Sequence, residues 1–359
     1  MDTLTHSILG AAIGVACAGP KLGRRSAWWG AFGGALPDID MAVRAIGGPW
    51  AEMAYHRSLT HTLWFCPVVG PAIGYGLWRF YHRTYAAARG GAASHPGAPP
   101  MRKPWMLALT AAVVAHPLLD LFTTYGTQLF WPMGSHRFAL DAISIVDPFY
   151  TLTLLAVLIV SFRYEARTRV RLCAGAITFT TAYLFYGWWL NAGAEDHARR
   201  QLAAEGVTQV EVAAYPTPLQ LHLRRIVARA PDAIRVGKLT MWSPHPVTWK
   251  STPVEQHRLI DATRASPHGQ LFEWFAMGQI HARMIESEGA LTVAIDDLRY
   301  AVATDAPEGF WGIRARFTPG GALLGPIETF RQPLPAPFLP AVGEVLRDAF
   351  AGDRGGSPR

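Results

Sequence analysis

The stretch HRSLTH, residues 56–61, places two imidazoles, an arginine and two hydroxyls in front of an apolar run that continues to Phe80. Ionisable groups at a membrane segment are expensive, and they are found there mainly where they bind, react or pair with one another. The stretch therefore predicts a polar site around which the first half of the chain is folded. We expect that site to hold metal, because more histidines and carboxylates accompany HRSLTH.

The composition is that of an integral membrane protein. The chain has 359 residues, of which 50% are hydrophobic and 16% charged, and the mean hydropathy is +0.13. Residues 1–191 hold 15 Lys/Arg against 8 Asp/Glu, whereas residues 192–359 hold 18 of each, so the net charge of +7 belongs to the apolar half. Basic residues between apolar runs set membrane orientation. We therefore expect no nucleic-acid partner.

Apolar runs lie at residues 4–19, 27–36, 59–80, 105–125, 143–162 and 172–192. A helix needs about 20 residues to cross the hydrocarbon layer. The pattern predicts a mainly α fold, with a polytopic transmembrane helical bundle of five to six segments over residues 1–191, the first two of them short. A small soluble α+β domain is expected over residues 192–351, followed by a disordered tail over residues 352–359.

Alternating apolar and polar residues predict strands at 219–228, 233–242, 290–303 and 309–317 in the second half. Helical periodicity predicts helices at 195–205, 254–263 and 270–286.

Lysine and arginine gather after the first apolar run, between the third and fourth, and between the fifth and sixth. The positive-inside rule makes these loops cytoplasmic. Six crossings then place the loops at 38–58 and 126–142, and the C-terminal domain, on the non-cytoplasmic side. We expect a multi-pass protein of the bacterial inner membrane.

Acidic and histidine residues of the apolar half collect near the non-cytoplasmic ends of the runs. They are Asp2, Asp38, Asp40, Asp120, Asp141 and Asp147, with His6, His56, His61 and His116. The sides were assigned from Lys and Arg alone, so this coincidence is an independent observation. Mixed imidazole and carboxylate ligands suit zinc, with manganese, iron or magnesium as alternatives. The surplus of ligands allows one or two ions.

Spacing shows how these groups could converge. His116 and Asp120 are four residues apart and share one helix face. Asp38 and Asp40 would project to the same side of an extended segment after Pro37. Ser58 is a candidate N-cap that would place His61 in the first turn of the following helix.

Simpler interpretations stay open for several residues. Asp2 and Asp147 have the pattern of helix N-caps, and His6 of a polar anchor at the membrane interface. Structural hydrogen bonds would account for His61 and His116, and a turn for the Asp38 and Asp40 pair. Arg57 and Arg137 are candidates for binding a substrate phosphate or lipid headgroup, although interface residues that extend to water look the same.

The motifs DTLTH (2–6), LPDID (36–40), HRSLTH (56–61), HPLLDLFTTYGT (116–127) and FALDAISIVDPFYT (138–151) resemble those of a known family. It is the YdjM/YbcI-type family of inner-membrane metal-dependent hydrolases, also described as LexA-binding, and the resemblance covers roughly residues 1–190. The family is grouped remotely with zinc-dependent phospholipase C and P1-type nucleases, helical proteins with a metal cluster. The resemblance implies seven metal-site candidates, namely His6, Asp38, Asp40, His56, His61, His116 and Asp120. It implies no particular substrate.

We expect a membrane-bound metal-dependent hydrolase that uses a metal-activated water at the non-cytoplasmic face, with a phosphoester or lipid-type substrate and membrane lipid as its surroundings. Asp120, Asp141 and Asp147 are the expected catalytic carboxylates, the last two as a base or as partners of ligating histidines. The alternative is a non-catalytic membrane protein, with a structural metal or a hydrogen-bonded His/Asp network and a soluble domain that binds a partner. A transporter fits less well, because the cluster lies at one face and no inverted repeat is visible.

Overall fold

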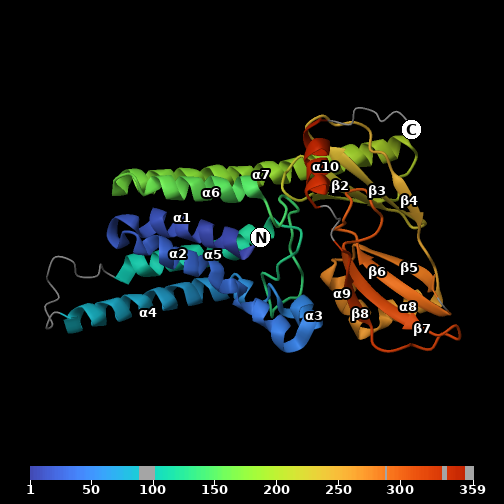
Figure 1. The fold of residues 1–359 in the computed structure, drawn as a ribbon, viewed down its shortest axis with the longest axis horizontal. Coiled ribbons are helices and arrows are strands. Elements are labelled where there is room, and N and C mark those ends of the chain that lie inside the picture. The colour runs from blue at the N-terminus through green and yellow to red at the C-terminus, as the bar shows by residue number, and fades with distance from the viewer. Residues whose placement is uncertain (89–101, 288, 334–337, 352–359) are drawn as a thin grey trace. The chain divides into compact units, whose positions relative to one another are not determined.

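A computed structural model describes residues 1–88, 102–287, 289–333 and 338–351 (Figure 1). The expected disordered tail lies outside these residues. The chain divides into two compact units. The first contains Met1–Val43, Tyr55–Leu140 and Ile145–Phe185, and the second contains Arg44–Ala54, Asp141–Ser144 and Tyr186–Arg359.

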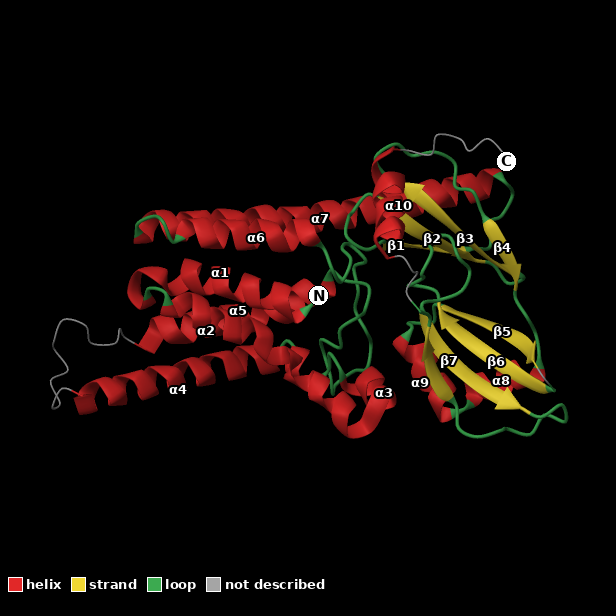
Figure 2. Ribbon diagram, viewed as in Figure 1, coloured by secondary structure: helices red, strands yellow, loops and turns green. Residues whose placement is uncertain are grey.

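The first unit is helical. Its elements are α1 (Thr3–Leu22), α2 (Arg25–Ala35), the 3-10 helices η1 (Leu36–Ala42) and η2 (Leu59–His61), α4 (Phe65–Ala88), α5 (Arg102–Leu121), α6 (Pro148–Ser161) and the beginning of α7 (Ala166–Ala204). Helix α3 (Val43–Tyr55) belongs mainly to the second unit. Helices α1, α2, α4, α5 and α6 run alongside one another (Figure 2).

Glycine lets α1 and α2 pack with their backbones in contact. A Cβ atom on Gly30 would lie 2.2 Å from the carbonyl oxygen of Gly10, and one on Gly34 would lie 2.2 Å from the carbonyl oxygen of His6. Small residues at four-residue spacing are typical of close helix pairs in membrane proteins. The contact fixes the end of α2 beside His6.

The prediction of a bundle of five to six membrane-crossing segments is wrong. Within the described part of the chain, two helices, α1 and α5, are long and apolar enough to cross a membrane. Helix α2 has 11 residues and α6 has 14, which is short of the roughly 20 that a span needs. Helices α4 and α7 are long, but charged, tyrosine and tryptophan residues dilute their apolar runs.

The second unit contains two four-stranded antiparallel sheets, each in sequential order, drawn as yellow arrows in Figure 2. The first is formed by β1 (Glu211–Pro216), β2 (Leu223–Arg229), β3 (Ala233–Thr240) and β4 (Lys250–Pro253). The second is formed by β5 (Ile280–Ser287), β6 (Ala290–Asp297), β7 (Trp311–Phe317) and β8 (Glu328–Arg331). Helices α8 (Arg258–Ala265), α9 (Pro267–Phe275) and α10 (Phe338–Ala351) complete the unit.

Two contacts tie distant segments into the second unit. The fully buried guanidinium of Arg224 donates to the carbonyl oxygens of Asp141, Ala142 and Gly187, at 2.8–3.1 Å. Trp50 of α3 lies against His268 of α9, with ring centroids 4.2 Å apart. The short segments 44–54 and 141–144 are therefore integral parts of this unit.

The expected helix at residues 270–286 is also wrong in its second half. Helix α9 ends at Phe275, and residues from Ile280 onward form β5, which pairs with β6 from Ile280–Asp297 to Ser287–Ala290. The cause is non-local, because strand pairing satisfies the backbone polar groups that local periodicity assigned to a helix.

Candidate metal centre

His116 has a defined orientation. It lies on α5 one turn before Asp120, and its Nδ1 atom is 2.5 Å from the carbonyl oxygen of Gly34 on α2. A carbonyl oxygen can only accept, so Nδ1 carries a proton, and Nε2 is the nitrogen left for a second proton or for a metal ion. This Nε2 atom lies 3.3 Å from Oδ1 of Asp38 and 3.5 Å from Oδ2 of Asp120.

His61 is oriented in a similar way. Its Nδ1 atom lies 3.2 Å from Oδ2 of Asp40 and 3.0 Å from Oγ1 of Thr60. A carboxylate on Nδ1 favours the tautomer with the lone pair on Nε2, as in many metal-ligating histidines. The Nε2 atom of His61 lies 3.3 Å from Oδ2 of Asp120 and 3.9 Å from Oδ1 of Asp38.

Asp38 and Asp40 lie on a 3-10 helix, η1, so the expected extended segment is wrong. On this helix the two carboxylates still offer ligand atoms within 4.8 Å of each other, although each makes its own hydrogen bonds. Oδ2 of Asp38 accepts from Thr3 at 2.6 Å, which leaves Oδ1 toward the histidines. Asp40 lies 2.8 Å from Nδ1 of His56 and accepts from Thr60 at 2.9 Å.

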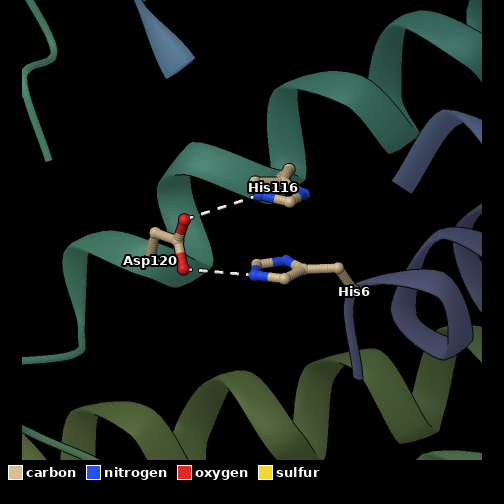
Figure 3. Close-up of side chains that lie close together, drawn as sticks. All are labelled: His6, His116 and Asp120. Carbon is tan, nitrogen blue, oxygen red and sulfur yellow. Dashed lines mark hydrogen bonds and ion pairs between the residues drawn. The ribbon is translucent and has the colours of Figure 1, made fainter. Parts of the chain in front are cut away.

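Asp120 uses its two oxygens differently. Oδ1 lies 3.1 Å from Nε2 of His6, lies 2.9 Å from Nη2 of Arg57, and contacts the amino group of Met1. Figure 3 shows the rings of His6 and His116 face to face, each joined to the Asp120 carboxylate; their centroids are 3.5 Å apart. Oδ2 is left for the Nε2 atoms of His61 and His116.

These atoms fit a metal ion. The buried atoms Nε2 of His61, Nε2 of His116 and Oδ2 of Asp120 have no hydrogen-bond partner within the part of the chain that the structure describes. Such lone-pair atoms can face one another only around a proton or a cation. Charge-assisted hydrogen bonds are usually about 2.7–2.9 Å long. In a tetrahedral site with metal–ligand distances of about 2.0–2.1 Å, ligand atoms lie about 3.3–3.4 Å apart. Four distances join the Nε2 atoms of His61 and His116 to the carboxylates of Asp38 and Asp120. Three of them, 3.3, 3.3 and 3.5 Å, match the spacing of ligand atoms around a tetrahedral metal ion.

Three groups of side chains offer ligand atoms within 4.8 Å of one another, among the described residues. They are His6, His116 and Asp120; Asp38, His61 and His116; and Asp38, Asp40 and His56. The structure thus brings all seven sequence-derived candidates together, and His116 and Asp38 each belong to two groups. Buried His/Asp groups in this arrangement could hold a metal ion.

The carboxylates on η1 are held in the ionised form that ligation requires. Burial by itself raises the pKa of Asp38, but the hydrogen bond and charge of a protonated His116 outweigh it, and the pKa lies well below its usual range. Burial likewise raises the pKa of Asp40, but the hydrogen bonds and charges of His56 and His61 outweigh it, and this pKa also lies well below its usual range.

The remaining predicted residues lie elsewhere. Asp147 caps α6, accepting from the backbone N–H of Tyr150 at 2.9 Å and from the hydroxyl of Tyr183 at 3.1 Å. Asp141 belongs to the second unit, and neither it nor Asp147 is in the three ligand groups. Arg137 donates to the carbonyl oxygen of Gly126 at 2.9 Å.

Sequence reasoning missed the groups that orient the ligands. Thr3 and Thr60 bond the η1 carboxylates, and Gly34 contributes a backbone carbonyl. The threonines lie inside the DTLTH and HRSLTH motifs, so their position was a signal. The Gly34 carbonyl belongs to the backbone of a separate helix, so no side chain in the sequence signals its role.

Fold and site together define a helical membrane protein with a buried His/Asp cluster. Residues 1–194 match the family model described as YdjM inner membrane protein, and the chain belongs to that family. It is also similar to the Uncharacterized protein YfhP of Bacillus subtilis (strain 168), with 31% identity over 166 residues, 44% of this chain and 45% of that protein. The chain thus spans less than half the length of this curated relative. No solved structure matches it.

Proposed function

We propose that the protein is a membrane-bound metal-dependent hydrolase that acts on a phosphoester or lipid-type substrate. The observation that carries the proposal is the convergence of Nε2 of His61, Nε2 of His116 and Oδ2 of Asp120, which are buried together without hydrogen-bond partners among the described residues. Leaving such groups unpaired is costly unless a ligand satisfies them.

Asp38, His61, His116 and Asp120 would hold the first ion. Two nitrogen and two oxygen ligands at these spacings favour zinc, with manganese, iron or magnesium as alternatives. A second ion would be held at either neighbouring group, by His6 beside Asp120 or by Asp40 and His56 beside Asp38. When bound, a divalent cation would polarise a phosphoryl oxygen and lower the pKa of a water molecule toward neutrality.

The protein's own residues would orient and enclose the reaction. Asp40 holds His61 through Nδ1, and the Gly34 carbonyl holds His116, so both imidazoles present Nε2. The side chains of Asp38, Asp40 and His56 are 9–11% exposed, whereas those of His61, His116 and Asp120 are at 0%. A substrate would therefore approach past Asp38, Asp40 and His56.

The site belongs, in this proposal, to the non-cytoplasmic face. Within the first unit, basic residues lie where α1 ends and α2 begins, where α5 begins, and where α6 ends and α7 begins, and these helix ends are at the left in Figure 1. His6 lies near the start of α1 and Asp120 near the end of α5, at the opposite ends of these helices. The basic residues include Lys21, Arg24, Arg25, Arg102, Lys103, Arg163 and Arg167. The positive-inside rule supports a cytoplasmic position for that end. A reporter enzyme that works only in the periplasm should be active when it is fused within the second unit. Activity at the same position of a reporter that works only in the cytoplasm would contradict this orientation.

Metal analysis of the detergent-purified protein tests the proposal. The wild type should contain zinc or another divalent ion and hydrolyse a phosphodiester or phospholipid, whereas His61→Ala and Asp120→Ala should lose both properties. His136→Ala is the matched control, because His136 is exposed and outside the three ligand groups. Equal metal content in all four proteins would remove the proposed site.

A structural metal is the second candidate, favoured by the 0% exposure of His61, His116 and Asp120. A structural ion has a closed shell, whereas a catalytic one keeps an open position. Cobalt-substituted protein separates the two. If inorganic phosphate changes the cobalt absorption spectrum, the ion has an open position, and an unchanged spectrum favours the structural role.

A further inference from the structure

Arg57 combines an unusual backbone with a buried side chain at the centre of HRSLTH. Its φ angle is +61°, a left-handed conformation that is strained for a residue with a long side chain. Its side chain is 4% exposed. Strained conformations persist where surrounding contacts impose them, and they are concentrated at functional sites.

The guanidinium group contacts the carboxylate that faces both ligating histidines. Nη2 lies 2.9 Å from Oδ1 of Asp120, and Nη1 donates to Oγ1 of Thr123 at 2.9 Å. Thr123 in turn donates to the backbone carbonyl of Asp120 at 2.7 Å. Arg57 and Thr123 thus hold Asp120 at two points, so its carboxylate cannot turn freely.

The backbone of Arg57 reaches the opposite side of the site. Its N–H donates to Oδ2 of Asp40 at 3.0 Å, and its carbonyl oxygen accepts from the N–H of Gln128 at 2.9 Å. Asp40 is the residue that faces Nδ1 of His61. One residue therefore fixes a carboxylate on α5 through its side chain and a carboxylate on η1 through its backbone.

We propose that Arg57 is a positioning residue that aims Asp120 and Asp40, rather than a group that binds substrate. Together with His6 and the amino group of Met1, it occupies Oδ1 of Asp120 and leaves Oδ2 directed at the Nε2 atoms of His61 and His116. The inference rests on the proposed metal site. Arg57 then has two opposing effects on the binding of a cation. Its positive charge repels the cation, whereas its hold on Asp120 and Asp40 favours binding.

Two substitutions separate geometry from charge. Arg57→Lys keeps the positive charge but replaces the rigid planar fork by a flexible ammonium. Arg57→Gln removes the charge. If positioning dominates, Arg57→Lys lowers zinc affinity by about 10- to 100-fold, as expected for loss of a group that orients a ligand. Arg57→Gln should weaken binding as well. Arg225→Lys is the control, because Arg225 is equally buried but donates to the carbonyl oxygens of Leu298 and Thr304.

Zinc affinity should be measured by competition with a chelator on full-length protein in detergent, together with the absorption spectrum of the cobalt-loaded form. The spectrum should change in Arg57→Lys and stay unchanged in Arg225→Lys. Unchanged affinity in Arg57→Lys, or tighter binding in Arg57→Gln, would overturn the inference. If Arg57→Lys fails to fold, Thr123→Val releases Nη1 alone and should cause a smaller loss of affinity. Failure of the wild type to bind zinc or cobalt would instead overturn the proposed function.

Discussion

The Nδ1–H group of His116 on α5 donates to the carbonyl oxygen of Gly34 on α2, at 2.5 Å. The orientation of a metal-site histidine therefore depends on how closely α2 packs against α1. That packing requires glycine, because a Cβ atom on Gly34 would lie 2.2 Å from the carbonyl oxygen of His6. Gly34 therefore both allows α2 to pack against α1 and fixes the orientation of His116.

Gly34→Ala should lower metal affinity although it changes no ligand. The added methyl group forces α1 and α2 apart, which moves the Gly34 carbonyl away from His116, and overpacking of this kind costs about 1–3 kcal/mol of stability. Zinc affinity and thermal unfolding would be measured together. Gly76→Ala is the control, because a Cβ atom there meets nothing within 4 Å. Equal affinities in the two variants would refute the link.

Asp38→Asn and Asp40→Asn should differ in severity. Asp38 offers Oδ1 directly to the central group and should be required for tight binding, whereas Asp40 acts on Nδ1 of His61 and its loss should cost about 10- to 100-fold. Isothermal titration with zinc measures both. Asp147→Ala should leave affinity unchanged and cost about 0.5–2 kcal/mol as a lost N-cap. The reverse order for Asp38 and Asp40 would reassign the central ligand.

Arg224→Met should destabilise the second unit strongly. The substitution leaves the carbonyl oxygens of Asp141, Ala142 and Gly187 without the guanidinium that now binds them. Each buried acceptor left without its hydrogen bond typically costs about 1–3 kcal/mol. Arg200→Met is the control, since the Arg200 side chain is 70% exposed, and such a change usually lies within about 0.5 kcal/mol. Denaturant unfolding compares them, and similar midpoints would contradict the prediction.

His281 should make the stability of the second unit depend on pH. Burial lowers the pKa of His281 below its ordinary 6.5, with Arg283 acting in the same direction and Asp296 and Glu255 opposing it. The unfolded chain then binds more protons than the folded chain below about pH 6.5, so the free energy of unfolding should fall as pH drops through that value. His281→Gln should flatten the dependence between about pH 7.5 and 5. An equally steep dependence in the variant would exclude His281 as its source.

The convergence of His6, His61, His116 and Asp120 could be predicted because charge alone marks helix ends. Lysine and arginine identify one end, and the few carboxylates and imidazoles gather at the other. The sequence could not reveal which apolar runs become spans, because a helix packed against other helices and one packed against lipid are both apolar. This ambiguity underlies the overestimated number of spans.

Other errors have non-local causes. The sequence predicts an extended segment for Asp38 and Asp40, whereas they lie on the 3-10 helix η1, where both carboxylates approach His61. The strand that begins at Ile280 depends on pairing with β6. The left-handed backbone of Arg57 is imposed by Asp40 and Gln128, which are distant in sequence.

Asp40 and His56 are the two ends of an excursion. Between them the chain leaves the helical unit, and residues 44–54 join the C-terminal unit, where Trp50 rests on His268. A protein cut after residue 194 would keep every proposed ligand and lose the partner of Trp50. The segment that joins the proposed ligands Asp40 and His56 would then lack the ring contact of Trp50. Separating the halves is therefore a perturbation of the site, and intact protein is the proper material for measuring its chemistry.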